Sequence, residues 1–556
     1  MESCQDRRRT AAGTAVLLLG CAVPLLALQA TAPKGSLEGR VVNAVSGEAL
    51  RKVNLTLTRM HAKDRDKPAA TQTDEYGHFA FRDVEAGAYR LSGQRTGFLR
   101  QEYGARLNPN SGAVLVVPAG QVLKDVTFKL APDAVISGRV TDQDGEPMPN
   151  LVVAALRSGY VRGKRQWTQA GGAQTNDRGE FRIGGLRPGR YLVSATDLNI
   201  GIGLAGMSTG PLAEKPEMSY GPTYFGNTPE LERAAPVDVQ MGDDRRGVEI
   251  QMLKTPTVRV RGRVVGLEGR ILVMILVRKG APGVGISAGA LGIVQPTDGT
   301  FEVKGVTPGM YVLTALSATE AAGPLAGAMR IEVADQHVDG IEFRLGGGGD
   351  LGGGVTLPDG KPGSAKNTSV ALEMVDFDLP NTPSALAGDD GTFTLKSVFP
   401  GTYRVNVSDM PEDCYVQSVK LGGQEVGDEG VEWSAGASGK LAIVLSRAGA
   451  QVEGVALRGD NQPLAGALVA LIPDSGRASR YRSTTTDHDG TFTLKGVPPG
   501  KYQAIAWEDL EPGAFRDAEF VKAFEGSAER LSLEENGHSK ITLKAVAFEK
   551  AAGGKH

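Results

Sequence analysis

Short runs of alternating apolar and polar residues recur along the whole chain, each bounded by glycine, proline, asparagine or aspartate. One clear run is Thr-Phe-Thr-Leu at residues 491–494, which follows Asp489-Gly490 and precedes Pro499-Gly500. Alternation with a period of two places every second side chain on the same face, so each run predicts a short β-strand with one buried face. About seven such strands per stretch of roughly 100 residues predict a series of β-sandwiches.

One spacing of residues occurs five times within these runs. A glycine is followed after 2 residues by phenylalanine, after 10 by a second glycine and after 12 by tyrosine. The first glycine supplies the positive φ of a tight turn, and we interpret the signature as a hairpin whose Phe and Tyr point into a sandwich core. The alternative, disfavoured by the alternating context, is an aromatic pair that stacks on a ligand. The copies are Gly77, Phe79, Gly87 and Tyr89; Gly179, Phe181, Gly189 and Tyr191; Gly299, Phe301, Gly309 and Tyr311; Gly391, Phe393, Gly401 and Tyr403; and Gly490, Phe492, Gly500 and Tyr502.

Each copy lies between an opening strand with the pattern apolar-x-Gly-x-Val and a closing strand of alternating residues. The chain is therefore predicted to be all-β, a tandem array of about five antiparallel seven-stranded β-sandwiches of the transthyretin-like or immunoglobulin-like kind. Because most joins are short, we expect the repeats to stack into a rod, with a hinge at the glycine run 346–349 and a long inserted loop at about 200–229 in the second repeat. The expected repeats are 34–131, 132–255, 256–347, 348–447 and 448–549.

The N-terminus predicts export. Arg7-Arg8-Arg9 precedes an apolar stretch at 15–28 and small residues near Ala30, which is typical of a signal peptide over residues 1–30. The apolar stretch is too short for a transmembrane span, so none is expected after the signal is removed. Leu18-Leu19-Gly20-Cys21 leaves a lipoprotein anchored at Cys21 as the less favoured alternative. The protein is expected in the periplasm, at the cell surface or outside the cell.

The composition argues against some classes of partner and provides few residues that could act in catalysis. The net charge of the 556 residues is −3 with no basic run in the body of the chain, which argues against binding nucleic acid. Of three cysteines only Cys414 lies beyond the signal peptide, where a buried core position is expected. None of the six histidines has a glutamate three residues later, so the zinc site of a carboxypeptidase is absent.

Two further chemical motifs are interpreted as turns or loops. Gly285-Ile286-Ser287-Ala288-Gly289 matches the Gly-x-Ser-x-Gly spacing of serine hydrolases, but no strand leads directly into it and no helix follows. The acidic pairs Asp142/Asp144, Asp389/Asp390 and Asp487/Asp489 offer too few oxygens for a calcium site and are expected to be turn residues. We therefore expect no catalytic residue, no metal site and no cofactor.

The opening strand, the Asp/Asn-x-x-Gly-x-Phe turn and the Pro-Gly-x-Tyr turn together resemble the carboxypeptidase regulatory-like domain. This is a transthyretin-like β-sandwich within the broader carbohydrate-binding-like fold. The resemblance extends from Gly35 to about Phe548. It implies an exported, non-catalytic bacterial repeat protein, since such domains are mostly accessory, and it says more about fold than about function.

Aromatic residues in the second repeat suggest a ligand. Tyr220, Tyr224 and Phe225 stand among glycine and proline in the inserted loop, and Trp167 lies in an earlier loop. Exposed aromatic side chains on rigid loops stack against sugar rings in many β-sandwiches. Alternatively, these rings fold back over their own sandwich. The sequence therefore predicts binding of a polysaccharide or cell-envelope glycan, with a structural or adhesive scaffold that contacts another envelope protein as the second hypothesis.

Overall fold

The computed structural model describes a chain that is almost entirely β-sheet. It covers residues 33–60, 67–105, 112–161, 163–197, 217–267, 272–278, 289–317, 325–345, 349–358, 365–375, 382–399, 401–433 and 439–547. No helix in these ranges is long and apolar enough to cross a membrane. The predicted signal peptide, Cys21 and the Gly-x-Ser-x-Gly residues 285–288 lie outside the described residues.

The strands form five successive units. Unit 1 contains β1 (Gly35–Asn43), β2 (Asn54–Arg59), β3 (Ala69–Gln72), β4 (His78–Val84), β5 (Gly87–Gln94), β6 (Gln101–Glu102), β7 (Leu115–Val117) and β8 (Val122–Leu130). Unit 2 contains β9 (Ala134–Thr141), β10 (Val152–Val161), β11 (Lys164–Gln174), β12 (Glu180–Leu186), β13 (Gly189–Thr196), β14 (Glu217–Tyr220), β15 (Thr223–Tyr224), η2 (Leu231–Arg233), β16 (Val237–Val239) and β17 (Asp244–Gln251). Unit 3 contains β18 (Lys254–Val265), β19 (Leu272–Arg278), β20 (Gly289–Ile293), β21 (Thr300–Val306), β22 (Gly309–Ser317), β23 (Leu325–Val333) and β24 (Val338–Arg344).

The last two units contain the remaining strands and most of the short helices. Unit 4 contains β25 (Gly349–Thr356), β26 (Ser369–Met374), β27 (Ser384–Leu386), β28 (Thr392–Val398), β29 (Gly401–Ser408), β30 (Tyr415–Leu421), β31 (Gln424–Glu425), β32 (Val431–Trp433) and β33 (Leu441–Ser446). Unit 5 contains β34 (Ala450–Leu457), β35 (Leu468–Pro473), η5 (Ala478–Arg480), β36 (Arg482–Thr485), β37 (Thr491–Val497), β38 (Gly500–Trp507), η6 (Ala514–Arg516), α1 (Ala518–Lys522), η7 (Glu525–Ser527), β39 (Glu529–Leu533) and β40 (His538–Lys544).

Every unit is a sandwich of two sheets with the same connections. In one sheet the opening strand lies between the strand that carries the signature Phe and the closing strand, as in β4-β1-β8 and β37-β34-β40. The second sheet contains the strand that begins at the second signature glycine, as in β36-β35-β38-β39. The opening strand is antiparallel to the Phe-carrying strand but parallel to the closing strand. The all-β sandwich prediction is therefore confirmed, with one parallel pair inside each otherwise antiparallel unit.

The interpretation of the signature as a hairpin is wrong. β37 and β38 flank the Pro-Gly turn, yet β37 pairs with β34 and β38 pairs with β35, so the two strands belong to opposite sheets. The turn is a corner at which the chain crosses from one sheet to the other. Because the sheets face each other, Phe492 and Tyr502 still meet in the core, where they are 4% and 1% exposed. The signature Phe and Tyr of the other four units are buried in the same way.

The tyrosine also closes its corner through a hydrogen bond. The hydroxyls of Tyr89, Tyr191, Tyr311 and Tyr502 each donate to the carbonyl oxygen of the residue four positions earlier, at 2.7 to 2.9 Å. Burial raises the pKa of Tyr403 to about 12 in the equivalent position of unit 4. A buried hydroxyl needs a partner, so this bond explains why the position is tyrosine and not phenylalanine.

The glycine of the opening strand is required by a close approach of backbones. A Cβ atom on Gly454 would lie 2.2 Å from the carbonyl oxygen of Ile541 on the parallel closing strand. The corresponding distances at Gly39 and Gly138 are 2.1 and 1.9 Å. Real Cβ atoms do not come this close to a backbone oxygen, so only glycine lets the opening and closing strands pair here.

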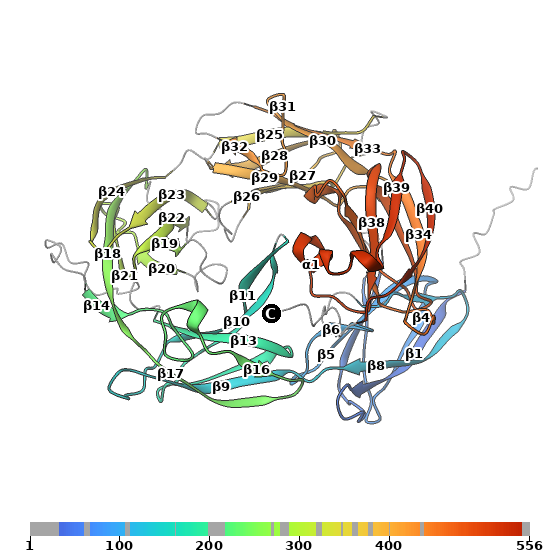
Figure 1. Cartoon of the computed structure of the whole chain (residues 1–556), viewed down its shortest axis with the longest axis horizontal. Helices are drawn as coiled ribbons and strands as arrows, with labels where there is room; N and C mark the ends of the chain where they lie inside the picture. The colour runs from blue at the N-terminus through green and yellow to red at the C-terminus, as the bar shows by residue number, and fades with distance from the viewer. Residues whose placement is uncertain are drawn as a thin grey trace, which may run out of the picture.

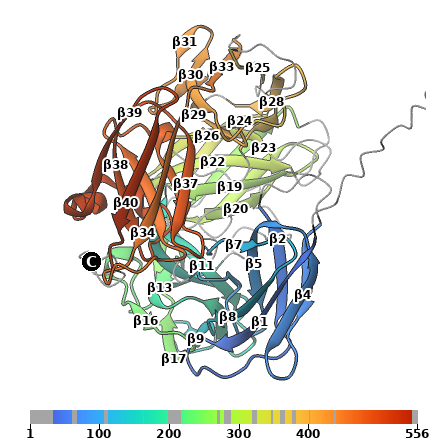
Figure 2. The same ribbon diagram turned by 90° about the vertical axis from the view of Figure 1, so that its right-hand side faces the viewer.

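The five units form a closed ring, which contradicts the expected rod. In Figure 1 the chain runs once around the ring, with the sheets that contain β10, β19, β26 and β38 facing the centre and those that contain β9, β18, β25 and β34 on the outside. Turned by 90°, unit 1 and unit 5 stand next to each other although they come from opposite ends of the chain (Figure 2). Of the predicted glycine hinge, Gly349 begins β25 and residues 346–348 lie outside the described residues.

Neighbouring units are joined by strands and hydrogen bonds that the repeat signature does not encode. β14, from the long insertion of unit 2, pairs antiparallel with the start of β18 and so adds a strand to unit 3. Between units 4 and 5, the Lys495 ammonium lies 3.1 Å from the Glu412 carboxylate, and the backbone N–H of Ala478 donates to Asp428 at 2.8 Å. These contacts hold unit 2 against unit 3 and unit 4 against unit 5.

Candidate functional site

The inner sheet of unit 5 has two apolar faces, which is why it carries an extra layer. Ile472, Ile505 and Trp507 point away from the sandwich core, yet they are at most 8% exposed. The segment 508–528, with η6, α1 and η7, lies over them and adds Phe515 and Phe524 to this second cluster. Burial of this much apolar surface holds a segment of very little regular structure in place.

A hydrogen-bonded cap fixes the short helix of this segment. The carboxylate of Asp517 accepts from the backbone N–H groups of Glu519 and Phe520 at 2.9 and 3.3 Å, as an N-cap residue does. The ring of Phe520 then packs against Phe524 with 5.0 Å between their centroids. The cap and the ring contact together orient α1 toward the centre of the ring of units (Figure 1).

Unit 2 reaches this segment with a long two-stranded arm. β10 pairs with β13 only over residues 152–157, whereas its pairing with β11 continues to Val161 and Lys164. Residues 158–161 and 163–167 therefore project beyond the sheet as a ribbon. At its tip Tyr160 meets Phe520 edge to face, with 5.7 Å between the centroids.

The backbones of the two units also come into contact at the arm. Gly163 has a φ of +73°, and a Cβ on it would lie 2.6 Å from the carbonyl oxygen of Arg516. Gly513, with a φ of +83°, lies similarly close to Tyr160, 3.2 Å from its carbonyl oxygen to a Cβ built on the glycine. Two glycines, one on each side, thus allow the arm to lie directly against η6.

Charges complement one another at the base of the arm. Arg157 and Arg187 of unit 2 face Glu511 and Asp509 of unit 5, and the Arg157 guanidinium lies 3.5 Å from the Glu511 carboxylate. Burial, followed by the positive charge of Arg157, lowers the pKa of Arg187, while Glu511 and Asp509 oppose that shift. Arg157 and Glu511 are about one-fifth exposed, so their attraction is less screened than that of a surface pair. We call this set of contacts between unit 2 and unit 5 the clasp.

A second contact completes the ring between units 1 and 5. Val114 forms a parallel β-bridge with Asp487, and Arg90 donates to the Thr485 hydroxyl at 3.4 Å. The same guanidinium lies 2.6 Å from the Glu102 carboxylate, which holds it in position. Gly466 of unit 5 lies against Ala113, 3.9 Å from the alanine Cβ to a Cβ built on the glycine.

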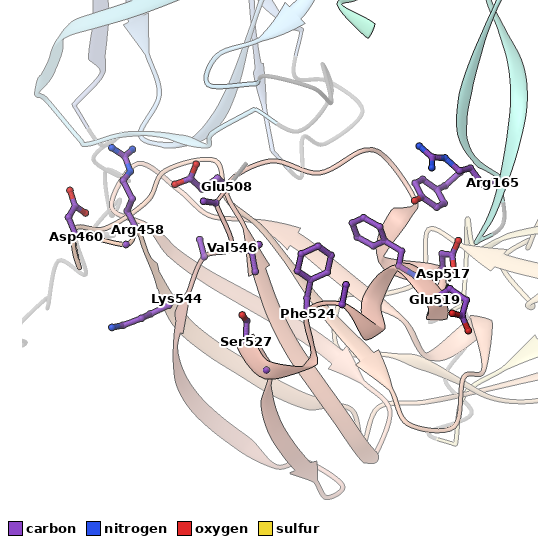
Figure 3. A pocket seen from close by; sticks show the side chains of 17 residues that line it. Arg165, Arg458, Asp460, Glu508, Asp517, Glu519, Phe524, Ser527, Lys544 and Val546 are labelled. Carbon is purple, nitrogen blue, oxygen red and sulfur yellow. Dashed lines mark hydrogen bonds between the residues drawn. The ribbon is translucent and has the colours of Figure 1, made fainter. Parts of the chain in front are cut away.

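A groove of about 1530 Å³ runs along unit 5 from the tip of the arm to the ends of β34 and β40. Arg458, Asp460 and Lys544 lie at one end, and Asp517 and Glu519 lie at the other beside the arm (Figure 3). Val546 and Phe524 lie between them (Figure 3). The groove thus combines an apolar middle with charged ends of both signs.

The ring of Tyr160 at the arm tip contacts two other side chains. Arg165 stacks over Tyr160 at 5.8 Å from the centroid, and Phe520 meets the ring from the other unit. Burial raises the pKa of Tyr160, an effect that Arg165 opposes and Asp517 reinforces. Tyr160 therefore serves the contact between units and leaves little ring surface for a ligand.

The four residues predicted to bind a ligand lie on unit 2 but do not form one exposed platform. Tyr224 is 8% exposed and packs with Leu156 and Leu192, and burial raises its pKa. Trp167 packs against this same cluster, whereas Phe225 packs against the sandwich core. These three side chains fold back over their own unit, as the alternative interpretation of the loop proposed.

Tyr220 lies at the join to unit 3. It ends β14, opposite Lys254 of β18, and the Lys254 ammonium lies 5.3 Å from the centroid of its ring. Tyr220 also packs against the core of unit 2 and is only partly buried. Its position couples the insertion to the next unit.

The acidic turns use their carboxylates internally. Asp142 and Asp487 each accept two backbone N–H groups within their own turn, and Asp390 accepts one together with the Thr392 hydroxyl. Asn176 makes the same bonds in unit 2. Within the described ranges no group of three His, Cys, Asp or Glu side chains is placed to hold a metal ion. These oxygens shape turns, as the sequence suggested.

The sequence contained a signal for the groove that its repeat pattern obscured. Leu-Val-Ala-Leu-Ile-Pro at residues 468–473 is apolar at every position instead of alternating, and the segment around 505–507 is similar. A strand that is apolar on both faces must be covered on both. The residues that provide the cover, 508–528, follow directly in the sequence.

Comparisons with known proteins agree with the fold. The sequence profile of the carboxypeptidase regulatory-like domain matches residues 36–130, 135–201 and 451–510. No curated protein matches the sequence.

Several solved structures resemble the chain weakly. The Bacillus anthracis TIE protein is 11% identical over 56% of this chain, with a TM-score of 0.16, and the match spans half of that protein, 50% of its length. The minor pilin GBS52 of Streptococcus agalactiae is 13% identical over 40% of this chain and 97% of its own, with a TM-score of 0.22. The major pilin subunit BcpA of Bacillus cereus is 11% identical over 56% of this chain and 99% of its own, with a TM-score of 0.14.

TM-scores this low support no argument. The assignment of domains therefore rests on the profile match and on the described fold. Units 1, 2 and 5 contain the matched regions, and units 3 and 4 share their strand order and their buried Phe and Tyr. The resemblance seen in the sequence is confirmed: the chain is a repeat protein with carboxypeptidase regulatory-like domains at residues 36–130, 135–201 and 451–510.

Proposed function

We propose that this protein is an exported, non-catalytic scaffold whose five sandwiches close into a ring and present a surface to a protein partner of the cell envelope. The observation that carries the proposal is the clasp. The segments that depart from the repeat, the arm of unit 2 and residues 508–528 of unit 5, pack against each other and border the groove. Segments that fix a shape and border a surface suit recognition of a partner.

The perturbed ionisable groups support a non-catalytic role. The pKa values of Tyr191, Tyr311 and Tyr502 are raised by burial, and their hydroxyls are bonded to corner carbonyls. Burial lowers the pKa of Arg482, which donates to the carbonyl of Gly496. Catalytic groups are usually perturbed where they line a cleft with a nucleophile or base beside them. Here the shifts belong to groups that hold the sandwiches together.

Glycan binding is the second candidate, and partial exposure of Tyr220 and Trp167 favours it. Both rings lie on unit 2, and each has one side packed against its own unit. The carbohydrate-binding-like fold adds support by resemblance. If the protein binds a glycan through these rings, a Tyr220→Ala, Trp167→Ala double variant would lose saturable binding to a polysaccharide.

One experiment separates the two candidates. A photoreactive amino acid would replace Ser527, which lines the groove, or Lys129, which is exposed on unit 1, in the full-length protein inside the producing cells. The scaffold proposal expects a discrete protein adduct from position 527 that is absent from position 129. No adduct from either position, together with saturable binding of the purified protein to an insoluble polysaccharide, would overturn it in favour of glycan binding.

A further inference from the structure

We infer that the groove beside the clasp binds an extended polypeptide segment with an apolar centre, acidic residues at one end and basic residues at the other. The inference rests on the scaffold proposal and specifies the part of the partner that is recognised. It depends on which charges in the groove are already paired, on its apolar middle and on its size.

Two cations at the β34–β40 end have no paired acid. Lys544 lies opposite Leu457 in the parallel pair, so Lys544 and Arg458 are neighbours, and both are exposed. Across the part of the chain that the structure describes, neither side chain forms a salt bridge. Asp460 and Glu508 also line this end (Figure 3), and Asp460 accepts a hydrogen bond from the backbone N–H of Gln462 at 3.1 Å. An acidic group on a ligand would therefore find two available cations here.

The opposite end has an available anion. Asp517 is occupied by capping α1, and Arg165 stacks on Tyr160. Glu519 is exposed in the first turn of the helix, and within the described ranges no cation contacts its carboxylate. A lysine or arginine of the ligand would pair with Glu519, and the two ends of the groove therefore require opposite charges.

The middle of the groove suits apolar side chains. Ala523 is exposed and Ala545 and Ala547 are partly buried, so small apolar side chains line this stretch above the nearly buried Val546 and Phe524. A volume of about 1530 Å³ exceeds the ~300–1,000 Å³ of typical small-molecule pockets. An elongated, partly apolar site of this size fits a polypeptide chain better than a compact ligand.

Glycans fit these features less well. Sugar recognition needs an aromatic face that is open to solvent, but Phe524 is nearly buried and Tyr160 is covered by Arg165 and Phe520. A polyanionic glycan would be repelled by Glu519 and Asp517. A peptide with charges of both signs meets neither obstacle.

The test measures fluorescence anisotropy of a labelled peptide with the sequence Glu-Glu-Val-Leu-Val-Leu-Lys-Lys against the full-length protein. Two matched peptides carry either four glutamates or four lysines at the same positions. The inference expects saturable binding of the mixed-charge peptide, about tenfold tighter than either single-charge peptide. Arg458→Glu with Lys544→Glu should weaken it about tenfold. A control with Lys522→Glu and Arg530→Glu, which lie outside the groove, should bind as the parent does.

A charge exchange makes the test specific. Glu519→Lys should weaken the mixed-charge peptide and strengthen the four-glutamate peptide, because the ligand's basic end would then face a lysine. No saturable peptide binding by the folded protein, or equal binding by all these variants, overturns the inference. If the Ser527 adduct still forms in cells with the Arg458→Glu, Lys544→Glu variant, the scaffold proposal stands and only this groove assignment fails. If no adduct forms from the parent protein and the purified protein binds an insoluble polysaccharide saturably, the scaffold proposal itself fails.

Discussion

The repeated frame and the inserted segments of this protein are built on different principles. The frame places one Phe and one Tyr in each of the five cores, joined by corners that bury both rings. The arm of unit 2 and residues 508–528 of unit 5 have no counterpart among the described residues of the other units, and they meet each other through Tyr160 and Phe520. The frame therefore determines what each unit is, whereas the insertions determine how the units are arranged.

This difference separates stability from assembly. Each of the five units has its own core cluster, which contains the buried Phe and Tyr of its signature. Closure of the ring relies on a few contacts that combine aromatic packing with partly exposed charges. Substitutions in the frame should therefore unfold a unit, while substitutions in the insertions should open the ring and leave the sandwiches folded.

The largest effect is expected from a core residue of the frame. Phe301 is 1% exposed, so Phe301→Ala should lower the free energy of unfolding of unit 3 by about 3–5 kcal/mol. Hydrogen exchange should accelerate in β21 and β22. The matched change in an insertion, Phe520→Ala, should leave exchange in β34 and β37 unchanged and accelerate it at the arm tip. If both changes accelerated hydrogen exchange equally in their own sandwiches, the distinction between the frame and the insertions would be wrong.

The next effect concerns two adjacent glycines of the unit 4 opening strand. A Cβ on Gly353 would lie 2.3 Å from the ring of Phe393 and 2.6 Å from the Leu441 carbonyl oxygen, whereas a Cβ on Gly352 meets nothing within 4 Å. Gly353→Ala should cost about 1–3 kcal/mol of stability through overpacking. Gly352→Ala should be neutral or slightly stabilising. Urea denaturation monitored by exchange in β25 would compare them, and similar costs would contradict the close-approach explanation.

A smaller effect is expected at the clasp. Arg157→Ala and Glu511→Ala should each weaken ring closure, and the double variant should show a coupling of about 1 kcal/mol, because the pair is only partly exposed. Small-angle X-ray scattering would detect the open ring as a larger radius of gyration, while circular dichroism should stay β-rich. Additive effects with an unchanged radius would mean that the pair does not hold the ring.

The smallest effect is a pH dependence in the frame. Hydrogen bonds from the Thr300 N–H and hydroxyl lower the pKa of Asp298 below its ordinary value of 3.8. A lowered folded-state pKa contributes stability above the unfolded pKa, and this contribution is lost as the pH falls through the folded pKa. Asp298→Asn should therefore narrow the stability difference between pH 5 and pH 2 in unit 3. Unit 2, whose corresponding turn is held by the uncharged Asn176 three residues before Gly179, serves as the internal control.

Much of the frame could be predicted because its information is local. Alternation around Phe492 and the fixed spacing to Tyr502 identify strands, turns and inward side chains without knowledge of partners. The interpretation of the corner as a hairpin failed because Asp-x-x-Gly and Pro-Gly turns have the same sequence pattern whether they join two paired strands or two strands of opposite sheets. Which strands pair is decided by the opening strand, more than 30 residues earlier in the chain.

The ring and the groove could not be predicted from local patterns. Arg157 and Glu511 belong to different units, and no periodicity relates them. Tyr224 stood among glycine and proline, as exposed loop aromatics do, but it is buried against Leu192 of its own unit. The doubly apolar runs at 468–473 and around 505–507 pointed to an added layer on unit 5, but similar runs also occur at 152–156 and 272–277.

Ring closure is the central claim, and an engineered disulfide tests it most directly. Ala113→Cys and Gly466→Cys would place two Cβ atoms about 3.9 Å apart across units 1 and 5, within the range that a disulfide requires. Gly466 has a φ of +73°, which strains a side chain there, so circular dichroism must first show that the double variant is folded. Cys4 and Cys21 would be replaced by serine, and Ala113→Cys with Leu386→Cys would serve as a distant control. The account predicts that mild oxidation links the first pair within one folded molecule and leaves the control pair reduced. Thiols that stay free at 113 and 466 in the folded monomer would contradict it.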